Sequence, residues 1–188
     1  MLKYIEEAGE YVEITGFRNV DIKDAEEFVK KARGKADGNV WVQLFDADLV
    51  ATWQHLYFAV LNALLAFRNR SNISKSAAME TILYASAQRQ ISKALPFIGV
   101  KSGSKNVALV ILGKNSDAVG AFLSMVSNRV GKAPDESVLD LSGEKAASIR
   151  RAFGVTEKEL ETVNGKSDGE EALVNLVIER MALLSTQL

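Results

Sequence analysis

A stretch of 19 residues without a formal charge, residues 49–67, constrains the fold of this chain more than any other part of its sequence. It is long enough to span a bilayer as a helix. However, polar side chains such as His55 and Asn62 interrupt it, and nothing else in the chain resembles a second span. Its apolar residues recur at helical spacing on more than one face, which is typical of a helix covered on two sides. We therefore expect a buried helix at about residues 48–69 and no membrane association.

Strand-like and helix-like segments alternate along the chain and predict an α/β (α+β) fold, with residues 1–188 forming a single domain. We expect a small mixed sheet of about four strands, packed with several helices. Period-two alternation, or branched and aromatic content, marks the expected strands at residues 11–17, 40–45, 107–112 and 137–141. Gly16 in the first of them is expected to mark a β-bulge.

Capping residues and apolar spacing define the expected helices. Asp21 is expected to cap the first helix, and Ser142 to cap a later one. Thr156 with Glu159 has the spacing of a capping box. The expected helices are residues 22–36, 48–69, 116–131, 142–153 and 170–185, with Asp46 or Asp48 capping the second. Turns or loops are expected at residues 37–39 and 164–169.

Residues 79–103 combine helical apolar spacing with unpaired positive charge. The apolar residues recur at three- and four-residue steps, which predicts one buried stripe of Met79, Ile82, Leu83, Ala87, Ile91, Ala94 and Leu95. Arg89 and Lys93 are four residues apart, so one helix would place them side by side on its outer face, with Gln88 beside them. Such a surface suits phosphate or carboxylate, although a solvated helix face has the same pattern.

Positive charge is concentrated in the middle third of the chain. The whole chain has a formal net charge of −1 and a pI of about 6.0, which argue against a general nucleic-acid or membrane-surface binder. Residues 49–116, however, hold eight Lys or Arg and one acidic residue, Glu80. The eight are Arg68, Arg70, Lys75, Arg89, Lys93, Lys101, Lys105 and Lys114. If the fold gathers several of them on one face, the protein has a basic patch without a basic pI.

The residue types that catalysis and metal binding require are scarce. The chain has no Cys, which excludes disulfides and thiolate chemistry and suits a reducing, cytoplasmic location. His55 is the single His, and in the middle of a helix it is better explained as a structural histidine than as a base or ligand. Residues 99–105 are glycine-rich and basic but lack the spacing of a phosphate-binding P-loop. We therefore expect no enzyme activity, no metal site and no cofactor.

The expected C-terminal helix carries two apolar stripes. Leu173, Val177 and Leu184 form one stripe, which can satisfy the core. The second stripe, formed by Val174, Ile178 and Met181, is either deeply buried as well or an interface for a partner. On the second interpretation, these three residues are the predicted partner-binding residues.

Four segments that follow one another along most of the chain resemble a known family. They are FDADLVAT at residues 45–52 with His55 following, ASAQRQI at 85–91, IGVK at 98–101 with Gly103 after it, and IERMALL at 178–184. The second segment is the most specific of the four. On these segments the chain resembles the small kinase-binding subunit of the KEOPS complex, called the PRPK-binding protein family in eukaryotes.

The resemblance implies an α/β domain without catalytic activity. Such subunits bind the amino-terminal lobe of the complex's small atypical kinase and, through it, the other subunits. They also help the assembly hold tRNA by its single-stranded 3′ CCA end, while a different subunit makes threonylcarbamoyl-adenosine beside the anticodon. Combined with the basic middle third, this predicts that RNA is bound by Arg70, Lys75, Gln88, Arg89, Lys93 and Lys101. Two other functions stay open: a small-ligand or nucleotide-binding α/β enzyme, and an oligomeric scaffold without a nucleic-acid role.

Overall fold

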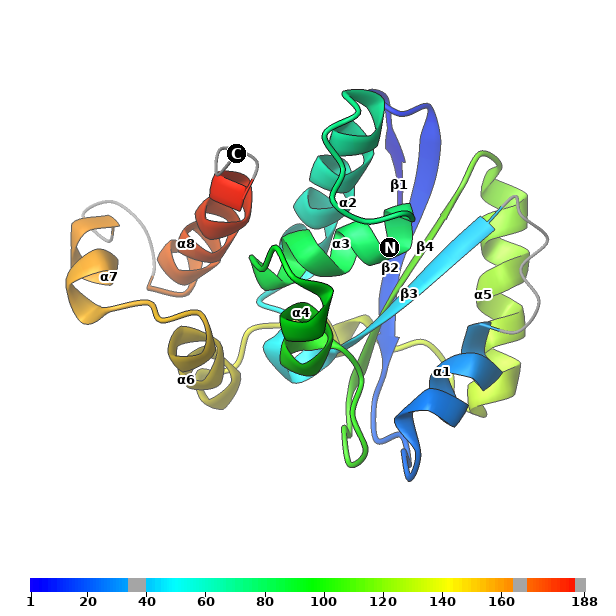
Figure 1. Cartoon of the computed structure of the whole chain (residues 1–188). Coiled ribbons are helices and arrows are strands. Elements are labelled where there is room, and N and C mark those ends of the chain that lie inside the picture. Colours follow the sequence, from blue (N-terminus) through cyan, green and yellow to red (C-terminus); the bar gives the residue numbers. More distant parts are fainter. Residues whose placement is uncertain (34–39, 164–168, 185–188) are drawn as a thin grey trace.

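A computed structural model describes residues 1–33, 40–163 and 169–184, and its centre is a four-stranded sheet of order β1-β2-β4-β3 (Figure 1). The strands are β1 (Leu2–Ile5), β2 (Glu10–Phe17), β3 (Val40–Asp46) and β4 (Val107–Gly113). The predicted α/β class and the strands expected at residues 11–17, 40–45 and 107–112 are confirmed. All three pairings between these strands are antiparallel, in contrast to the mixed sheet that we expected.

The fourth strand lies at the start of the chain and not at residues 137–141, where we expected it. β1 pairs with β2 at one edge of the sheet. The segment expected as a strand forms instead the 3-10 helix η2 (Glu136–Leu139), because the side chain of Asp135 accepts a hydrogen bond from the backbone of Ser137 and starts a tight turn. The N–H of Asp135 donates to the carbonyl of Gly16, so the segment still lies against β2.

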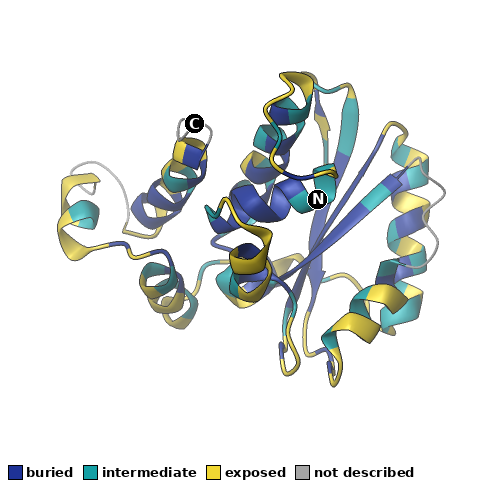
Figure 2. Cartoon of the chain, in the orientation of Figure 1, coloured by how far each residue is buried: buried dark blue, intermediate teal, exposed yellow. Residues whose placement is uncertain are grey.

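Helices cover both faces of the sheet. The helices α2 (Trp53–Arg68), α3 (Ala77–Ser86) and α4 (Ile91–Ile98) lie over one face, and α1 (Ala25–Arg33) and α5 (Ser116–Val130) lie over the other (Figure 1). Every residue of β4 is buried, which is why the strand reads as a continuous apolar run (Figure 2). Its side chains alternate between two cores, with Ala108, Val110 and Leu112 in one and Val107, Leu109 and Ile111 in the other.

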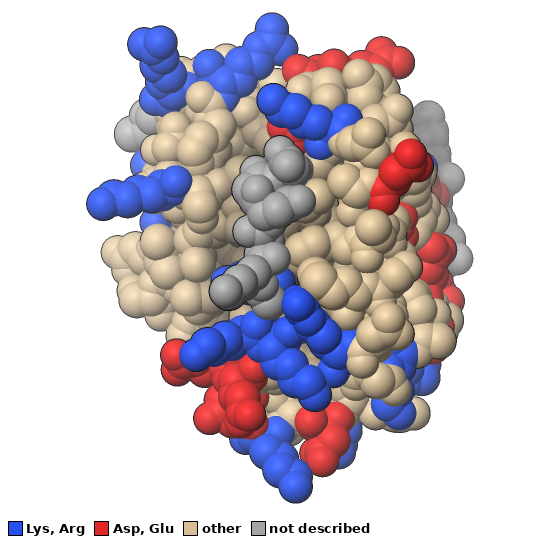
Figure 3. All heavy atoms as spheres, turned by 90° about the vertical axis from the view of Figure 1, so that its right-hand side faces the viewer, with Lys and Arg blue, Asp and Glu red and all other residues tan. Residues whose placement is uncertain are grey.

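The two helices α1 and α5 form the side of the molecule that Figure 3 shows. Asn115 caps α5, and Asp24 takes the place of the predicted cap Asp21 on α1, since Asp24 Oδ1 accepts a hydrogen bond of 2.9 Å from the N–H of Glu27. Acidic residues lie in the first turn of α1 and basic residues in its last turn, as the helix dipole favours. The turn predicted at residues 37–39, and all but the last residue of the loop predicted at 164–169, lie outside the described residues.

Three further helices, α6 (Gly143–Ala152), α7 (Glu157–Val163) and α8 (Gly169–Leu183), extend the layer of α2 and α3 away from the sheet (Figure 1). Ser142 caps α6 as predicted. The predicted capping box is also confirmed, because Thr156 Oγ1 accepts a hydrogen bond from the N–H of Glu159, whose carboxylate accepts one from the N–H of Thr156. A third core lies between α6 and α8.

The long uncharged stretch forms α2, which begins later than expected. Asp46 Oδ1 accepts a hydrogen bond from the N–H of Asp48, and a 3-10 helix, η1 (Ala47–Leu49), follows. Extended backbone at Val50 and Thr52 separates η1 from α2. No helix among residues 1–33, 40–163 and 169–184 has both the length and the apolar character that a membrane crossing needs.

Gly16 allows η2 to pack closely on β2 and does not mark a bulge. It pairs with Ala108 in regular register. A Cβ atom at Gly16 would lie 2.3 Å from Val138 Cγ2 and 2.4 Å from the carbonyl oxygen of Val107. Both distances are far below van der Waals contact, and the Val107 oxygen belongs to a central strand that cannot move easily.

We expect Gly16→Ala to lower the free energy of unfolding by about 1–3 kcal/mol, because the added methyl group overpacks the contact between η2 and the sheet. Gly120→Ala is the matched control, since a Cβ atom there meets nothing within 4 Å on the exposed side of α5. It should raise the free energy of unfolding by roughly 0.5–1 kcal/mol, as alanine does in a helix. Urea unfolding measures both, and equal effects would contradict the close packing at Gly16.

Candidate functional site

The helix α8 is buried along both of its apolar stripes. Leu173, Val177 and Leu184 are buried, as expected. On the stripe assigned to a partner, however, Met181 is 0% exposed and packs in the core formed with α2 and the sheet. The reason is that α8 packs on α2 and α3 on one side and on α6 and α7 on the other. Met181 is therefore a core residue of this chain, which agrees with deep burial and not with its assignment as a partner-binding residue.

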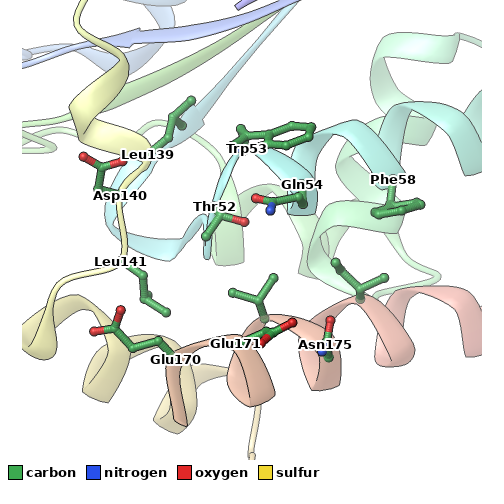
Figure 4. A pocket seen from close by; sticks show the side chains of 12 residues that line it. Thr52, Trp53, Gln54, Phe58, Leu139, Asp140, Leu141, Glu170, Glu171 and Asn175 are labelled. Atoms are coloured by element: carbon green, nitrogen blue, oxygen red, sulfur yellow. The ribbon is translucent and has the colours of Figure 1, made fainter. Parts of the chain in front are cut away.

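The other two residues of that stripe, Val174 and Ile178, line a groove between α8 and the start of α2 (Figure 4). The groove has a volume of about 510 Å³. Trp53 and Phe58 of α2 form its opposite wall (Figure 4). Two further apolar residues line it: Leu139 is the last residue of η2, and Leu141 lies between η2 and α6. The groove thus has apolar walls from three separate parts of the chain.

Aromatic contacts hold the α2 wall of the groove in place. The ring of Trp53 makes an edge contact with Tyr57 at a centroid distance of 6.1 Å, and Tyr57 makes one with Phe58 at 5.6 Å. The Nζ atom of Lys3 lies 4.4 Å from the centroid of the Trp53 ring, within the range of a cation–π contact. Phe58 is nevertheless 37% exposed. A rigid aromatic wall that is still open to solvent is typical of an interface anchor.

The groove also carries acidic side chains. Asp140, Glu170 and Glu171 line it together with the amides of Gln54 and Asn175. No ion pair within the described part of the chain uses any of the three carboxylates. The two glutamates also complement the dipole of α8, in whose first turn they lie. An apolar groove with acidic side chains suits a protein segment that combines apolar residues with Lys or Arg.

One wall of this groove was predicted from the sequence and the other was not. Trp53 and the residues around it were assigned to a helix buried on two sides, and Asp140 and Leu141 to the end of the strand expected at residues 137–141. A signal was present in the adjacent aromatic residues Tyr57 and Phe58, because consecutive residues of a helix point about 100° apart and rarely share one core. The identity of the facing element could not be read from this signal.

The stretch at residues 79–103 is not one helix, so the predicted side-by-side placement of Arg89 and Lys93 on a single helix is wrong. Ala87 adopts the left-handed conformation, with φ of 51° and ψ of 35°. Its N–H donates to the carbonyl of Tyr84, and the N–H of Gln88 donates to that of Leu83, which is the hydrogen-bond pattern of a Schellman motif. Arg89 and Gln88 therefore lie in the corner between α3 and α4, whereas Lys93 lies in the first turn of α4.

The six predicted RNA-binding residues come from three places. Arg70 and Lys75 are exposed on the segment between α2 and α3, and Lys101 is exposed after α4. Of the corner residues, Arg89 and Lys93 are exposed and Gln88 is half-buried. Two of the cations also contact carbonyl oxygens: Arg89 Nη1 donates to Leu184 at 3.4 Å, and Lys101 Nζ donates to Phe97 at 3.1 Å. The corner between α3 and α4 thus contacts the end of α8.

Glu80, the acidic residue of the middle third, is not available to the cations of this surface. It is completely buried, and its carboxylate accepts hydrogen bonds of 2.6–3.1 Å from the backbone N–H groups of Ile73 and Ser74. The carboxylate therefore fixes the segment that carries Arg70 and Lys75. All eight Lys and Arg residues of the middle third are exposed.

His55 has a structural place in the fold, as its position in the sequence predicted. It is fully buried, its Nδ1 accepts a hydrogen bond of 3.1 Å from the N–H of Ala51, and its Nε2 lies 2.8 Å from the carbonyl oxygen of Ala85, to which it donates. The ring thus connects the start of α2 to the end of α3. Burial, the largest cause, lowers the pKa of His55 from 6.5 to about 4. Across the described ranges, no group of three or more His, Asp or Glu side chains could hold a metal ion.

An apolar groove and an exposed basic segment on an α/β fold are typical of a protein that acts by binding partners. Comparison with known families gives the class: residues 17–185 match the family described as kinase-binding protein CGI-121. The chain is also 35% identical over 142 residues to the regulatory protein Cgi121 of Methanocaldococcus jannaschii, which covers 76% of this chain and 81% of the relative. The chain belongs to the CGI-121 family of kinase-binding regulatory proteins, which confirms the resemblance found in the sequence.

The low pKa of His55 predicts a loss of stability at acidic pH. The unfolded chain binds a proton at His55 below pH 6.5, whereas the folded chain binds it only below about pH 4. The stabilisation is complete above pH 6.5 and is lost as the pH falls through this window, by about 3 kcal/mol in total. Urea unfolding of the parent and of His55→Gln from pH 7 to pH 4 separates this effect from that of the carboxylates. If the free energy of unfolding falls by the same amount between pH 7 and pH 4 in the two proteins, the prediction is wrong.

Proposed function

We propose that the chain is a non-catalytic accessory subunit of the KEOPS tRNA-modification complex, and that it acts in the cytoplasm. In this function it binds the small atypical kinase of the complex and, through the kinase, the other subunits. It also helps to hold the single-stranded 3′ CCA end of tRNA, while another subunit forms threonylcarbamoyl-adenosine. Membership of the kinase-binding family supports the first contact, and the exposed basic segment supports the second.

The groove between α2 and α8 is the site that we assign to the kinase. The observation that carries this assignment is the pair of Val174 and Ile178 facing the aromatic wall of Trp53 and Phe58 across a groove with acidic side chains. Desolvation of apolar and aromatic side chains supplies most of the energy of such contacts. The acidic residues favour a partner surface that presents Lys or Arg beside its apolar residues. The segment of the kinase that docks in the groove is therefore expected to carry Lys or Arg.

Replacing Ile178 by Arg should remove kinase binding, because it places an unpaired charge in the apolar part of the groove. We expect the affinity to fall by at least about thirtyfold, the lower end of the hot-spot range. Co-elution with the kinase on size exclusion and isothermal titration measure the loss. Val163→Arg is the matched control, because Val163 is 37% exposed on α7 and does not line the groove.

The outcome also separates the groove from the core. If Ile178→Arg keeps a melting temperature near that of the parent and still binds the kinase, the kinase docks elsewhere. If the variant unfolds, Glu171→Lys decides, since Glu171 is exposed and lines the groove. Kinase affinity unchanged by Glu171→Lys at low salt would then exclude the groove.

The segment from α2 to α4 is the surface that we assign to tRNA. Its cations are exposed, and its acidic residue Glu80 is buried. Ile91 and Leu95 lie one turn apart on α4 and are 40% and 39% exposed, close in sequence to Lys93. Apolar side chains beside cations suit an unpaired base, because they can pack on its open face. In a duplex the faces of the bases are stacked on each other. This supports a contact with the unpaired CCA end.

Replacing both Arg89 and Lys93 by Ala should weaken tRNA binding through the loss of two phosphate contacts. A plot of log affinity against log salt has a negative slope, and the magnitude of this slope should decrease by about 1.5 units. The matched control is the double change of Arg151 and Lys158 to Ala, which removes two exposed cations from α6 and α7. A slope equal to that of the parent would exclude Arg89 and Lys93 as the contact.

Removal of CCA from the tRNA should weaken binding to the parent protein. Undiminished affinity for the trimmed tRNA would show that another part of the tRNA makes the contact.

A further inference from the structure

The side of the sheet that faces away from α2, α3 and α4 has a cavity of its own. It lies between α1, α5 and the segment that follows β2, and its volume is about 250 Å³. Three cations line it: Lys31 from the last turn of α1, Arg129 from the last turn of α5, and Lys132 just beyond α5. Phe28 and Asn19 contribute apolar and amide surface.

Lys and Arg residues outnumber acidic residues in the lining of this cavity. Lys30 and Arg33 lie in the same turn of α1 as Lys31, so five Lys or Arg residues come together where the two helices end. Figure 3 faces this side and shows Lys and Arg atoms gathered in its lower centre, with Asp and Glu atoms beside and below them. Asp21 also lines the cavity, but no ion pair within the described ranges joins it to any of these cations.

Arg33 and Arg129 are half-buried, and each has one guanidinium nitrogen that is buried without a hydrogen-bond partner among the described residues. Arg129 Nη1 is inaccessible to solvent and has no hydrogen-bond partner in the part of the chain that the structure describes. Arg33 Nη2 donates to Gln43 Oε1 at 2.6 Å, but Arg33 Nε is also buried and has no partner in residues 1–33, 40–163 and 169–184. No carboxylate within the described ranges forms an ion pair with either guanidinium. Burial lowers the pKa of Arg33 from its usual value.

The helix dipole does not account for this arrangement. It favours cations in the last turns of α1 and α5, but such cations normally extend into water, where they are solvated. A buried guanidinium donor without an acceptor is costly and therefore uncommon in folded proteins. An anion in the cavity would supply a countercharge to Lys31, Arg129 and Lys132, which form no ion pair within the described ranges.

We propose that the cavity between α1 and α5 binds a phosphate group through Arg129, Lys31 and Lys132. A phosphate group offers several acceptor oxygens in different directions, which matches donors that converge from two helices and a loop. The group can come from the backbone of an RNA or from a small phosphate compound, and the chemistry of recognition is the same. The site lies on the opposite face of the sheet from the segment assigned to the CCA end, and the proposal does not depend on that assignment.

Pyrophosphate is the probe that tests the site, without kinase or tRNA. It should raise the Tm of the full chain more than sodium chloride or sodium acetate of the same ionic strength does. In isothermal titration, Lys132→Gln and Arg129→Gln should each raise the Kd for pyrophosphate by about tenfold or more, as expected for the loss of a charge-assisted contact. Lys158→Gln, which removes an exposed cation from α7, should leave the Kd unchanged.

Three results would overturn the proposal: no stabilisation beyond that by chloride, equal stabilisation by acetate, or equal pyrophosphate affinity in Lys132→Gln and the parent. Lys132 is exposed, so its replacement leaves the fold intact even if Arg129→Gln unfolds. The salt dependence of tRNA binding then identifies the source of the phosphate. A smaller slope in Lys132→Gln assigns the site to the RNA backbone, and an unchanged slope assigns it to a small phosphate compound.

Discussion

The structure depends on the burial of α2 between the sheet and the helices α3 and α8. Alanine residues at positions 59, 63 and 66 are buried, and side chains of this size allow the neighbouring helices to approach closely. His55 fixes the start of the helix by binding backbone groups on both sides. Two aromatic side chains of α2, Trp53 and Phe58, line the groove toward α8. The uncharged stretch that decides the fold therefore also provides one wall of the groove.

The sequence predicted those parts of the fold that one element determines by itself. β2, β3 and β4 follow from side-chain alternation or apolar runs, and the caps at Ser142 and Thr156 from local hydrogen bonding. The errors lie where a few backbone hydrogen bonds or a neighbouring element decide. Ala87 gives no sign of the left-handed conformation that ends α3, and the burial of Met181 depends on how many helices surround α8. The second wall of the groove could not be found for the same reason.

Charge counts along the sequence succeeded for one surface and failed for another. In residues 49–116 the count predicted exposed cations correctly, and the fold strengthens the result by burying Glu80. Residues 1–48, by contrast, hold 7 Lys or Arg against 11 Asp or Glu, so the count predicts an acidic segment. The helix α1 separates these charges along its length, and packing against α5 brings its basic end beside Arg129. A local excess of charge created by packing leaves no trace in a count along the chain.

The two surfaces assigned to partners are connected through α8. Val174 in the groove and Leu184, whose carbonyl accepts a hydrogen bond from Arg89, are ten residues apart, or about 15 Å along the helix. A kinase in the groove and an RNA at the corner of α3 and α4 would therefore contact opposite ends of one rigid element. Met181 lies between these ends and anchors α8 in the main core. Its burial, which removes it from the surface for partners, is what keeps the two surfaces at a fixed distance.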